Sequence, residues 1–267
     1  MTKRGTGLPA IEIPEHQNLI ISTTFSYICC MQLFYVPAIT TATLHLPEEE
    51  ARHAIQVLRK RTGDVLDIVD GRGGWFQATI TAIDKRSCAI RVEQTRQEAY
   101  RAPSRLVMAV SPTKNNERFE WFLEKATEIG VDEIIPLQCA RTERPRIRAN
   151  RYEKVLVSAM KQSLQAWLPR LHPLTPFSAA VAATTAGAQK YLGWCDESVN
   201  TPLIHNYQLA SDVCIFIGPE GDFTAAEVDL ATTAGFQAVT LGPNRLRTET
   251  AALTATQMIA FLNQLKK

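Results

Sequence analysis

Short apolar runs alternate with helix-like segments in the last third of the chain. Residues 213–217 (VCIFI) predict a buried strand, and residues 237–241 predict a second one. Between them, residues 224–227 (TAAE) have the spacing of a capping box, which predicts that a helix begins there. A last helix, beginning at Thr248 or Thr250, should fill most of the remaining chain. This alternation predicts parallel strands joined by crossover helices.

Both predicted strands end in a Gly-Pro loop. The first loop is residues 217–221 (IGPEG) and the second is residues 241–250 (LGPNRLRTET). Either loop alone is also typical of an ordinary strand-to-helix turn. Because loops at the carboxyl ends of parallel strands bind ligands in such folds, we expect the two to share one site. Stiff loops that expose backbone N–H and C=O groups suit a flat, uncharged heterocycle such as adenine. The sequence lacks the glycine-rich motifs that bind phosphate groups.

The rest of the chain predicts two domains after an extension. Residues 31–100 combine alternating apolar and polar positions with turn residues, which predicts a small β-barrel. The composition turns polar around residues 97–104, and residues 104–267 form the larger α/β domain. Residues 1–30 have no clear pattern, and we interpret them as a poorly ordered extension. Their apolar stretch is too interrupted for a signal peptide.

Three further helices follow from periodicity and capping. Residues 47–61 predict one helix, which would end in the basic run Arg59-Lys60-Arg61. Residues 115–129 predict a second, capped by Asn115 or Asn116 and ended by Gly130. Residues 151–167 predict a third.

Composition limits the class of protein. A hydrophobic content of 45% and a charged content of 21% are ordinary for a soluble globular protein. The six cysteines form no Cys-x-x-Cys pair and no cluster with histidine, so we expect free thiols in a reducing cytoplasm and no metal site. No apolar stretch is long enough for a transmembrane helix.

Positive charge is concentrated in one segment. Residues 141–170 hold eight basic residues against two acidic ones, although the whole chain has a net charge of only +2. Such a segment is either a solvated basic face or a surface for a polyanion such as nucleic acid.

Residues 217–221 together with 241–252 resemble the carboxyl-terminal signature of the SPOUT methyltransferases, and within them the RsmE family. The resemblance extends from about Met31 to the end of the chain. Further segments similar to the family are Leu58-Arg59, Asp70-Gly71, residues 125–131, residues 141–144 and Gln162-Ser163. Two departures are Pro145, where serine is more usual, and residues 164–167, which replace a segment that usually contains an arginine.

The resemblance implies a fold and an activity. The fold would be an α/β parallel sheet with a carboxyl-terminal trefoil knot, preceded by a PUA-like β-barrel that binds RNA. The activity would be methylation of N3 of a uridine in 16S ribosomal RNA of the small ribosomal subunit, with S-adenosylmethionine as the cofactor. It also implies a homodimer with the last helix at the interface.

The resemblance also assigns residues. The cofactor-binding residues would be Gly218, Pro219, Glu220, Gly221, Leu241, Gly242, Leu246, Arg247, Thr248 and Ala251. The RNA-binding residues would be Arg52, Arg59, Arg61, Arg141 and Arg144. The basic run at 59–61 has a second explanation, a favourable interaction with a helix dipole.

The chemistry requires a group that helps uridine N3 lose its proton. We hypothesise Arg247 as a cation that stabilises the resulting anion, with Glu249 or Glu220 as a base or an orienting group. Either glutamate could instead serve the loop structure through hydrogen bonds or an ion pair. Two alternative functions are a SPOUT enzyme that modifies another RNA or atom, such as a ribose 2′-OH, and a non-catalytic RNA-binding factor.

Overall fold

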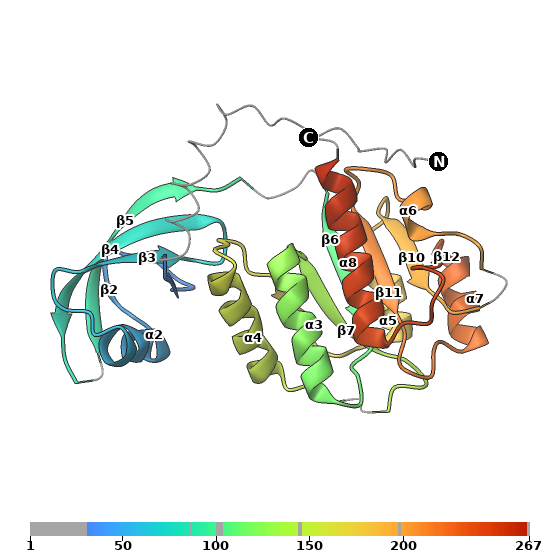
Figure 1. Cartoon of the computed structure of the whole chain (residues 1–267), viewed down its shortest axis with the longest axis horizontal. Coiled ribbons are helices and arrows are strands. Elements are labelled where there is room, and N and C mark those ends of the chain that lie inside the picture. The colour runs from blue at the N-terminus through green and yellow to red at the C-terminus, as the bar shows by residue number, and fades with distance from the viewer. Residues whose placement is uncertain (1–30, 86, 100–103, 144–145, 197–198, 266–267) are drawn as a thin grey trace, which may run out of the picture. The chain divides into compact units, whose positions relative to one another are not determined.

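Two β-sheets organise the chain (Figure 1); the first packs one hydrophobic cluster and the second packs two. The computed structural model describes residues 31–85, 87–99, 104–143, 146–196 and 199–265. The predicted extension over residues 1–30 lies outside these described ranges.

The first sheet has five strands in the order β1-β3-β4-β5-β2. Strand β1 runs parallel to β3, and the other neighbours are antiparallel. Alternate residues of its strands are buried in one cluster with α2, as the period of two predicted. The strands are β1 (Leu33–Tyr35), β2 (Thr43–His45), β3 (Val65–Val69), β4 (Gly74–Ile83) and β5 (Cys88–Gln97).

The predicted helix over residues 47–61 is shorter and less regular than expected. An α-helix, α2 (Glu48–Arg52), continues into a π-helical turn, η2 (His53–Val57). Arg59 then has a φ of +54°, in the left-handed region, which ends the helical conformation. The basic run at 59–61 therefore follows the helix and does not form its last turn.

The second sheet is parallel throughout and has the order β12-β10-β11-β6-β7-β8, with β9 beside β7. This confirms the predicted parallel strands with crossover helices. The strands are β6 (Leu106–Val110), β7 (Glu133–Gln138), β8 (Arg170–Leu171), β9 (Thr175–Pro176), β10 (Gln189–Gly193), β11 (Val213–Ile217) and β12 (Gln237–Val239).

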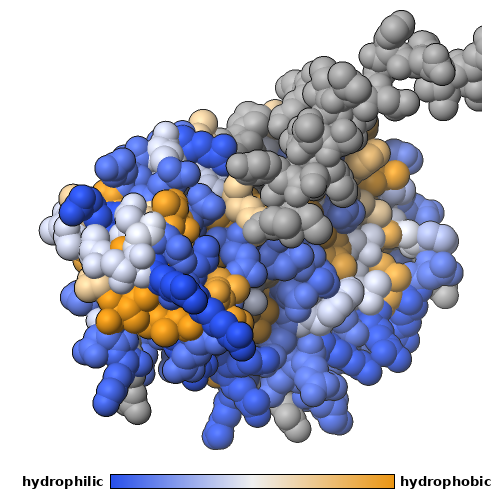
Figure 2. All heavy atoms as spheres, turned by 60° about the vertical axis from the view of Figure 1, so that its left-hand side comes forward, coloured by the Kyte–Doolittle hydropathy of each residue, from blue (hydrophilic) through white to orange (hydrophobic). Residues whose placement is uncertain are grey.

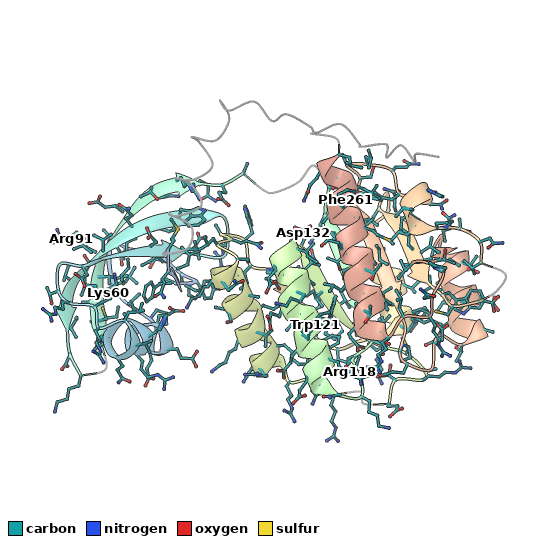
Figure 3. All side chains as sticks on the ribbon, in the orientation of Figure 1. Lys60, Arg91, Arg118, Trp121, Asp132 and Phe261 are labelled. Atoms are coloured by element: carbon teal, nitrogen blue, oxygen red, sulfur yellow. The ribbon has the colours of Figure 1, made fainter. Side chains whose placement is uncertain are left out.

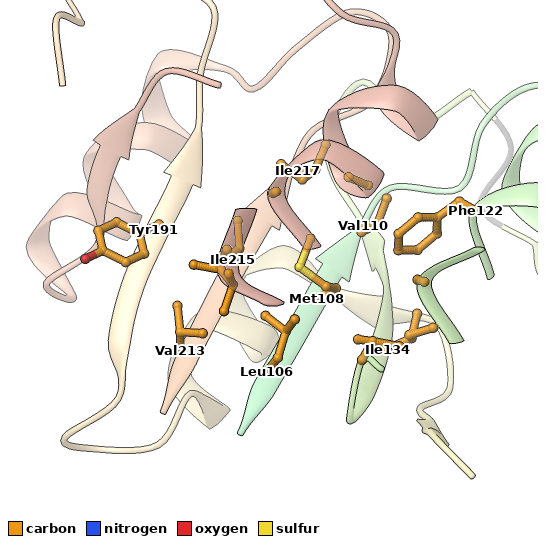
Figure 4. Close-up of a cluster of buried hydrophobic side chains, with 14 of the residues drawn as sticks. Leu106, Met108, Val110, Phe122, Ile134, Tyr191, Val213, Ile215 and Ile217 are labelled. Carbon is orange, nitrogen blue, oxygen red and sulfur yellow. The ribbon is translucent and has the colours of Figure 1, made fainter. Parts of the chain in front are cut away.

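Strand β11 is buried on both faces, and its side chains alternate between two clusters. Val213, Ile215 and Ile217 enter a cluster with α3, α4 and α8 (Figure 4). Cys214 and Phe216 enter the other, with α5 and α7. The sheet therefore lies between two helical layers. The helices are α3 (Asn116–Ile129), α4 (Ala149–Gln162), α5 (Phe177–Ala183), α6 (Leu203–Asn206), α7 (Ala225–Thr233) and α8 (Thr248–Gln264).

Local signals set several helix ends. The Asn115 side chain accepts a hydrogen bond from the Glu117 N–H and caps α3, and the α7 capping box between Thr224 and Glu227 is present. The third predicted helix was placed wrongly. It begins at Ala149 and ends at Gln162. The helix cannot continue to residue 167, because Leu164 has a φ of +54° that an α-helix cannot contain.

One face of the molecule is mainly polar. Figure 2 shows a largely hydrophilic face on which apolar residues gather in separate areas. Helix α8 is not covered all round within this chain, since Phe261 on it is 55% exposed. Among the described helices, none has the length and apolarity that a membrane span requires.

Candidate active site

Three neighbouring strands end at the same edge of the parallel sheet. Strands β12, β10 and β11 are adjacent, and all three run in the same direction. The loop after β10 begins at Trp194, the loop after β11 begins at Gly218, and the loop after β12 begins at Thr240. The two Gly-Pro loops therefore lie at one edge, as the sequence predicted, with the loop after β10 between them.

Glycine allows the three strand ends to pack closely. A Cβ atom added to Gly193 would lie 2.8 Å from Cδ1 of Ile217 and 3.7 Å from Cδ1 of Leu241. A side chain at this position would therefore require the end of the Ile217 side chain to move. Gly242 has a φ of +141° and open space around it, so here glycine is needed for the backbone conformation.

Hydrogen bonds tie the loops to each other and to α8. The buried Thr248 hydroxyl, in the first turn of α8, donates to the Gly218 carbonyl at 3.1 Å. The Cys195 N–H donates to Oδ2 of Asp222 at 3.2 Å and joins the loop after β10 to the loop after β11. The three loops and the start of α8 therefore form one connected site.

Residues from α3 and the loop before it complete this edge. The Lys114 N–H donates to Oε1 of Glu220 at 3.0 Å. Nε of Arg118, in the first turn of α3, lies 3.7 Å from Oε1 of Glu249. Glu249 is buried, and its Oε2 has no hydrogen-bond partner within the described ranges.

The loop after β7 also reaches this site. Nη1 of Arg141 donates to the Gly221 carbonyl at 2.7 Å. Behind it, the buried Glu227 carboxylate accepts from the Ala140 N–H and from the Thr224 N–H, each at 2.8 Å. Arg141 therefore supports the first Gly-Pro loop directly, a contact that the sequence did not suggest.

The predicted cofactor-binding residues gather here with different exposures. Gly218, Pro219 and Thr248 are buried, Leu241, Leu246 and Ala251 are half-buried, and Glu220, Gly221, Gly242 and Arg247 are exposed; the predicted catalytic residue Glu249 is also buried. Within the described ranges, Arg247 forms no ion pair.

The predicted RNA-binding residues are more dispersed. Arg52, Arg59 and Arg61 are exposed on or just after the helical turns of the first sheet's domain. Figure 3 shows their neighbour Lys60, together with Arg91 on β5, on this part of the chain. Arg144 lies outside the described residues.

Sequence reasoning missed Lys114, Arg118 and Glu227. The capping box did identify Glu227 as a helix residue, but its second contact is with Ala140, which is distant in sequence. No local pattern marks the contacts of Lys114 or Arg118, because both depend on segments that meet only in the folded chain.

Among the cysteines that the structure describes, none is an activated nucleophile. Burial raises the pKa of the Cys139 thiol far above its ordinary value and raises the pKa of Cys214 to about 12. Partial burial and the Asp222 carboxylate raise the pKa of Cys195. These thiols are therefore protonated at neutral pH. In the described part of the chain, no group of histidine, cysteine or acidic residues is placed to hold a metal ion.

Comparison with known proteins identifies the family. A family described as an RNA methyltransferase domain matches residues 100–260, and an RNA methyltransferase PUA domain matches residues 46–93. A relative from Mycobacterium bovis, named ribosomal RNA small subunit methyltransferase E, is 30% identical over 242 residues, covering 86% of this chain and 91% of the relative. The chain belongs to the ribosomal RNA small subunit methyltransferase E family.

Solved structures of similar proteins agree with this membership. A probable rRNA methyltransferase from Porphyromonas gingivalis is 43% identical, with a TM-score of 0.81, and the match covers 89% of this chain and all of that one. A family member from Neisseria gonorrhoeae, solved with S-adenosyl methionine bound, is 28% identical with a TM-score of 0.75, over 87% of this chain and 98% of that one. Membership makes this chain an RNA methyltransferase with a PUA domain.

Proposed function

We propose that this enzyme transfers a methyl group from S-adenosylmethionine to N3 of a uridine in 16S ribosomal RNA of the small ribosomal subunit. The observation that carries the proposal is the joining of the two Gly-Pro loops at one edge of the sheet, through the bond from Thr248 to Gly218. Family membership supplies the reaction class, and the name of its members supplies the substrate.

The loop residues fit the cofactor. Gly221 and Gly242 are exposed, and the half-buried Leu241 and Leu246 offer apolar surfaces for a flat ring. These groups suit an uncharged adenine, because none of them would neutralise a triphosphate. When bound, S-adenosylmethionine supplies the methyl group on a positively charged sulfur.

The proposal includes a knotted backbone and a separate role for each of the two domains. Residues 104–267 would form the SPOUT domain, with a trefoil knot that holds the two Gly-Pro loops together. Residues 31–100 would form a PUA-like β-barrel that binds RNA. Support comes from the two family matches and from the close packing around Gly193.

Two residues at the start of α8 are the proposed catalytic groups. Arg247 is exposed beside the cofactor loops and can bring a guanidinium to the target base. Glu249 is buried next to it, and this burial favours an orienting role over that of a base. Loss of the N3 proton leaves negative charge on the uracil oxygens, which a fixed cation stabilises.

Exposed arginines are proposed to hold the RNA. Arg52, Arg59 and Arg61 would contact phosphate groups from the PUA-like domain, because arginine pairs well with phosphate oxygens. Arg141 would contribute indirectly, since its guanidinium already donates to Gly221. We place the enzyme in the cytoplasm, where such subunits are assembled, and the free thiols of Cys88, Cys139, Cys195 and Cys214 agree with a reducing compartment.

We also propose a homodimer that forms through α3 and α8. Apolar residues exposed on these two packed helices include Trp121, which is 42% exposed, and Phe261 (Figure 3). A groove beside them is lined by Ile129, Leu253, Thr254, Gln257, Met258 and Phe261. A surface of this kind is typical of an interaction site.

A charged residue in this groove should separate the two copies. Phe261→Glu should sediment as a monomer in analytical ultracentrifugation at concentrations where the unaltered protein sediments as a dimer. The control is Leu230→Glu, which places the same charge at an exposed leucine of α7 and should leave the dimer intact. A dimer that survives Phe261→Glu would move the interface to another surface.

Methyl transfer is tested directly with tritium-labelled S-adenosylmethionine. The substrate is small ribosomal subunits from cells that lack this gene, and the modified nucleosides are separated after digestion. We expect label in N3-methyluridine. Label in another nucleoside, or in ribose, would keep the methyltransferase but overturn the proposed target. Absence of label together with absence of cofactor binding by calorimetry would indicate an RNA-binding factor without activity.

A further inference from the structure

Two arginine–glutamate pairs of similar exposure lie at opposite edges of the parallel sheet. Arg118 pairs with Glu249, and their side chains are 41% and 10% exposed. Arg105 pairs with Glu133, and theirs are 44% and 9% exposed. In both pairs a half-exposed guanidinium is held by a nearly buried carboxylate. The pairs differ in position, since only Arg118 is at the edge with the Gly-Pro loops.

The position of Arg118 follows from the chain direction. It lies in the first turn of α3, which begins after the carboxyl end of β6, and Glu249 lies in the first turn of α8. Figure 3 shows Arg118 at the end of α3 where α8 begins, while Asp132 marks the opposite end. Lys114, just before α3, donates to Glu220 in the first Gly-Pro loop. Arg118 is therefore next to the proposed catalytic groups.

Glu249 is only partly satisfied by Arg118. Its Oε1 lies 3.7 Å from Nε of Arg118, which is an ion pair without a short hydrogen bond. Its Oε2 is buried and has no hydrogen-bond partner in the described part of the chain. An unpartnered buried carboxylate oxygen is costly, so this arrangement suits a site that a bound molecule completes.

Arg118 keeps most of its hydrogen-bonding capacity. A guanidinium has five N–H donors and stays protonated at any pH of interest, and the contact with Glu249 involves the Nε end. The terminal nitrogens of Arg118 are therefore available to an anion. The buried carboxylate limits the directions in which the side chain can point, which lowers the entropy cost of ordering it on a substrate.

We propose that Arg118, positioned by Glu249, stabilises the negative charge that develops on the target uracil when N3 loses its proton. This inference rests on the proposed function. The N3–H bond breaks and its proton leaves to solvent; the N3 electron pair then forms the bond to the methyl carbon as the carbon–sulfur bond breaks. The sulfur keeps that bonding pair and becomes a neutral thioether. Arg118 touches the base and is a catalytic residue, whereas Glu249 is a positioning residue.

The deprotonated uracil can interact with two cations at once. Charge on a deprotonated uracil is shared between O2 and O4, which flank N3 on either side. Arg247 approaches from the cofactor loop, and Arg118 approaches from α3. Arg118 contributes a guanidinium whose position is set before the substrate binds, which is the property that makes electrostatic stabilisation effective.

Replacing Arg118 with alanine tests the inference through the pH dependence of turnover. A nearby cation lowers the pKa of uracil N3–H because it favours the deprotonated form. Removing the cation raises that pKa, so less of the base is deprotonated at a given pH. We expect Arg118→Ala to reduce kcat on the order of 10²-fold near neutral pH. Its kcat should continue to rise at pH values where the unaltered enzyme has reached its plateau.

The matched control is Arg105→Ala. It removes a guanidinium of the same exposure from a pair with an equally buried glutamate, but at the other edge of the sheet. We expect Arg105→Ala to keep the unaltered pH profile. Both variants are first compared by thermal unfolding and by calorimetric binding of S-adenosylmethionine, which should show that they fold and bind cofactor alike.

Three further measurements separate the effect of the Arg118 charge from an effect on the structure. Small subunits carrying 5-fluorouridine have a more acidic N3–H, so they should restore part of the activity of Arg118→Ala. Arg118→Lys, which keeps a positive charge, should lose less activity than Arg118→Ala. Glu249→Gln, which keeps the shape of the side chain, should shift the pH profile in the same direction by a smaller amount.

The outcomes distinguish this inference from the proposed function. If the unaltered enzyme does not form N3-methyluridine, the proposed function fails. If it does, but Arg118→Ala has the pH profile of Arg105→Ala and gains nothing from 5-fluorouridine, then only the role of Arg118 is overturned.

Discussion

Replacing Arg247 with alanine should lower turnover on small ribosomal subunits by on the order of 10²–10³-fold. The side chain is exposed beside the cofactor loops and forms no ion pair in the described ranges, so its removal breaks no contact that supports the fold. Its proposed catalytic role is to stabilise the charge that forms on the base during the reaction. The measurement is single-turnover methylation with labelled S-adenosylmethionine, together with calorimetric titration of the cofactor.

The comparison between rate and affinity decides the role of Arg247. An interaction made only in the transition state lowers kcat and leaves the Kd of the cofactor nearly unchanged. Asn244→Ala is a suitable control, because Asn244 is exposed on the same loop and has no proposed catalytic role. An unchanged turnover in Arg247→Ala would remove this residue from the mechanism. A loss confined to cofactor affinity would make it a binding residue.

Replacing Phe216 with alanine should lower the free energy of unfolding by about 3–5 kcal/mol. Phe216 is completely buried on β11, and its ring packs against those of Phe177 and Phe236 at centroid distances of 5.7 Å and 4.6 Å. Truncation would remove these contacts and leave a cavity that helices on both sides of the ring can fill only in part. Equilibrium urea denaturation measures the loss.

Leu230→Ala is the control for this prediction. Leu230 lies on α7, which covers the same face of the sheet, but its side chain is exposed, so the change should stay within about 0.5 kcal/mol. If Phe216→Ala were no less stable than Leu230→Ala, the cluster around β11 would not be a main source of stability.

The sequence predicted those features whose cause is local. The apolar run of β11 lies between two helical layers, so every residue of it is buried, and a continuous run marks it clearly. Asn115 and the pair Thr224 and Glu227 act on backbone groups in their own turn, so their spacing is sufficient to place a helix start.

Features with distant causes were missed or placed wrongly. The sequence did not predict that the Arg141 guanidinium donates to Gly221, because that residue is far away in the sequence. Periodicity cannot report such a partner. The left-handed conformations of Arg59 and Leu164 were also not predicted, because neither residue type indicates a positive φ. The helices before them were therefore predicted too long.

For the same reason, the sequence predicted only the part of the candidate site that comes from continuous loop motifs. The loop motifs are continuous in sequence, so the residues from Gly218 to Gly221 and from Leu241 to Thr248 could be named in advance. Arg118 and Lys114 come from another part of the chain, and only the parallel pairing of β6 with β11 brings them to this edge.

That pairing has a consequence for synthesis of the protein. Strand β6 ends at Val110, whereas its neighbour β11 begins at Val213, so the ribosome must add a long stretch of chain before the two can meet. Until then β6 can pair with β7 alone, and its other backbone edge, together with apolar side chains such as Met108, remains uncovered. Contacts this distant in sequence slow folding, and an open strand edge is prone to aggregation. The nascent enzyme is therefore most vulnerable midway through its own translation.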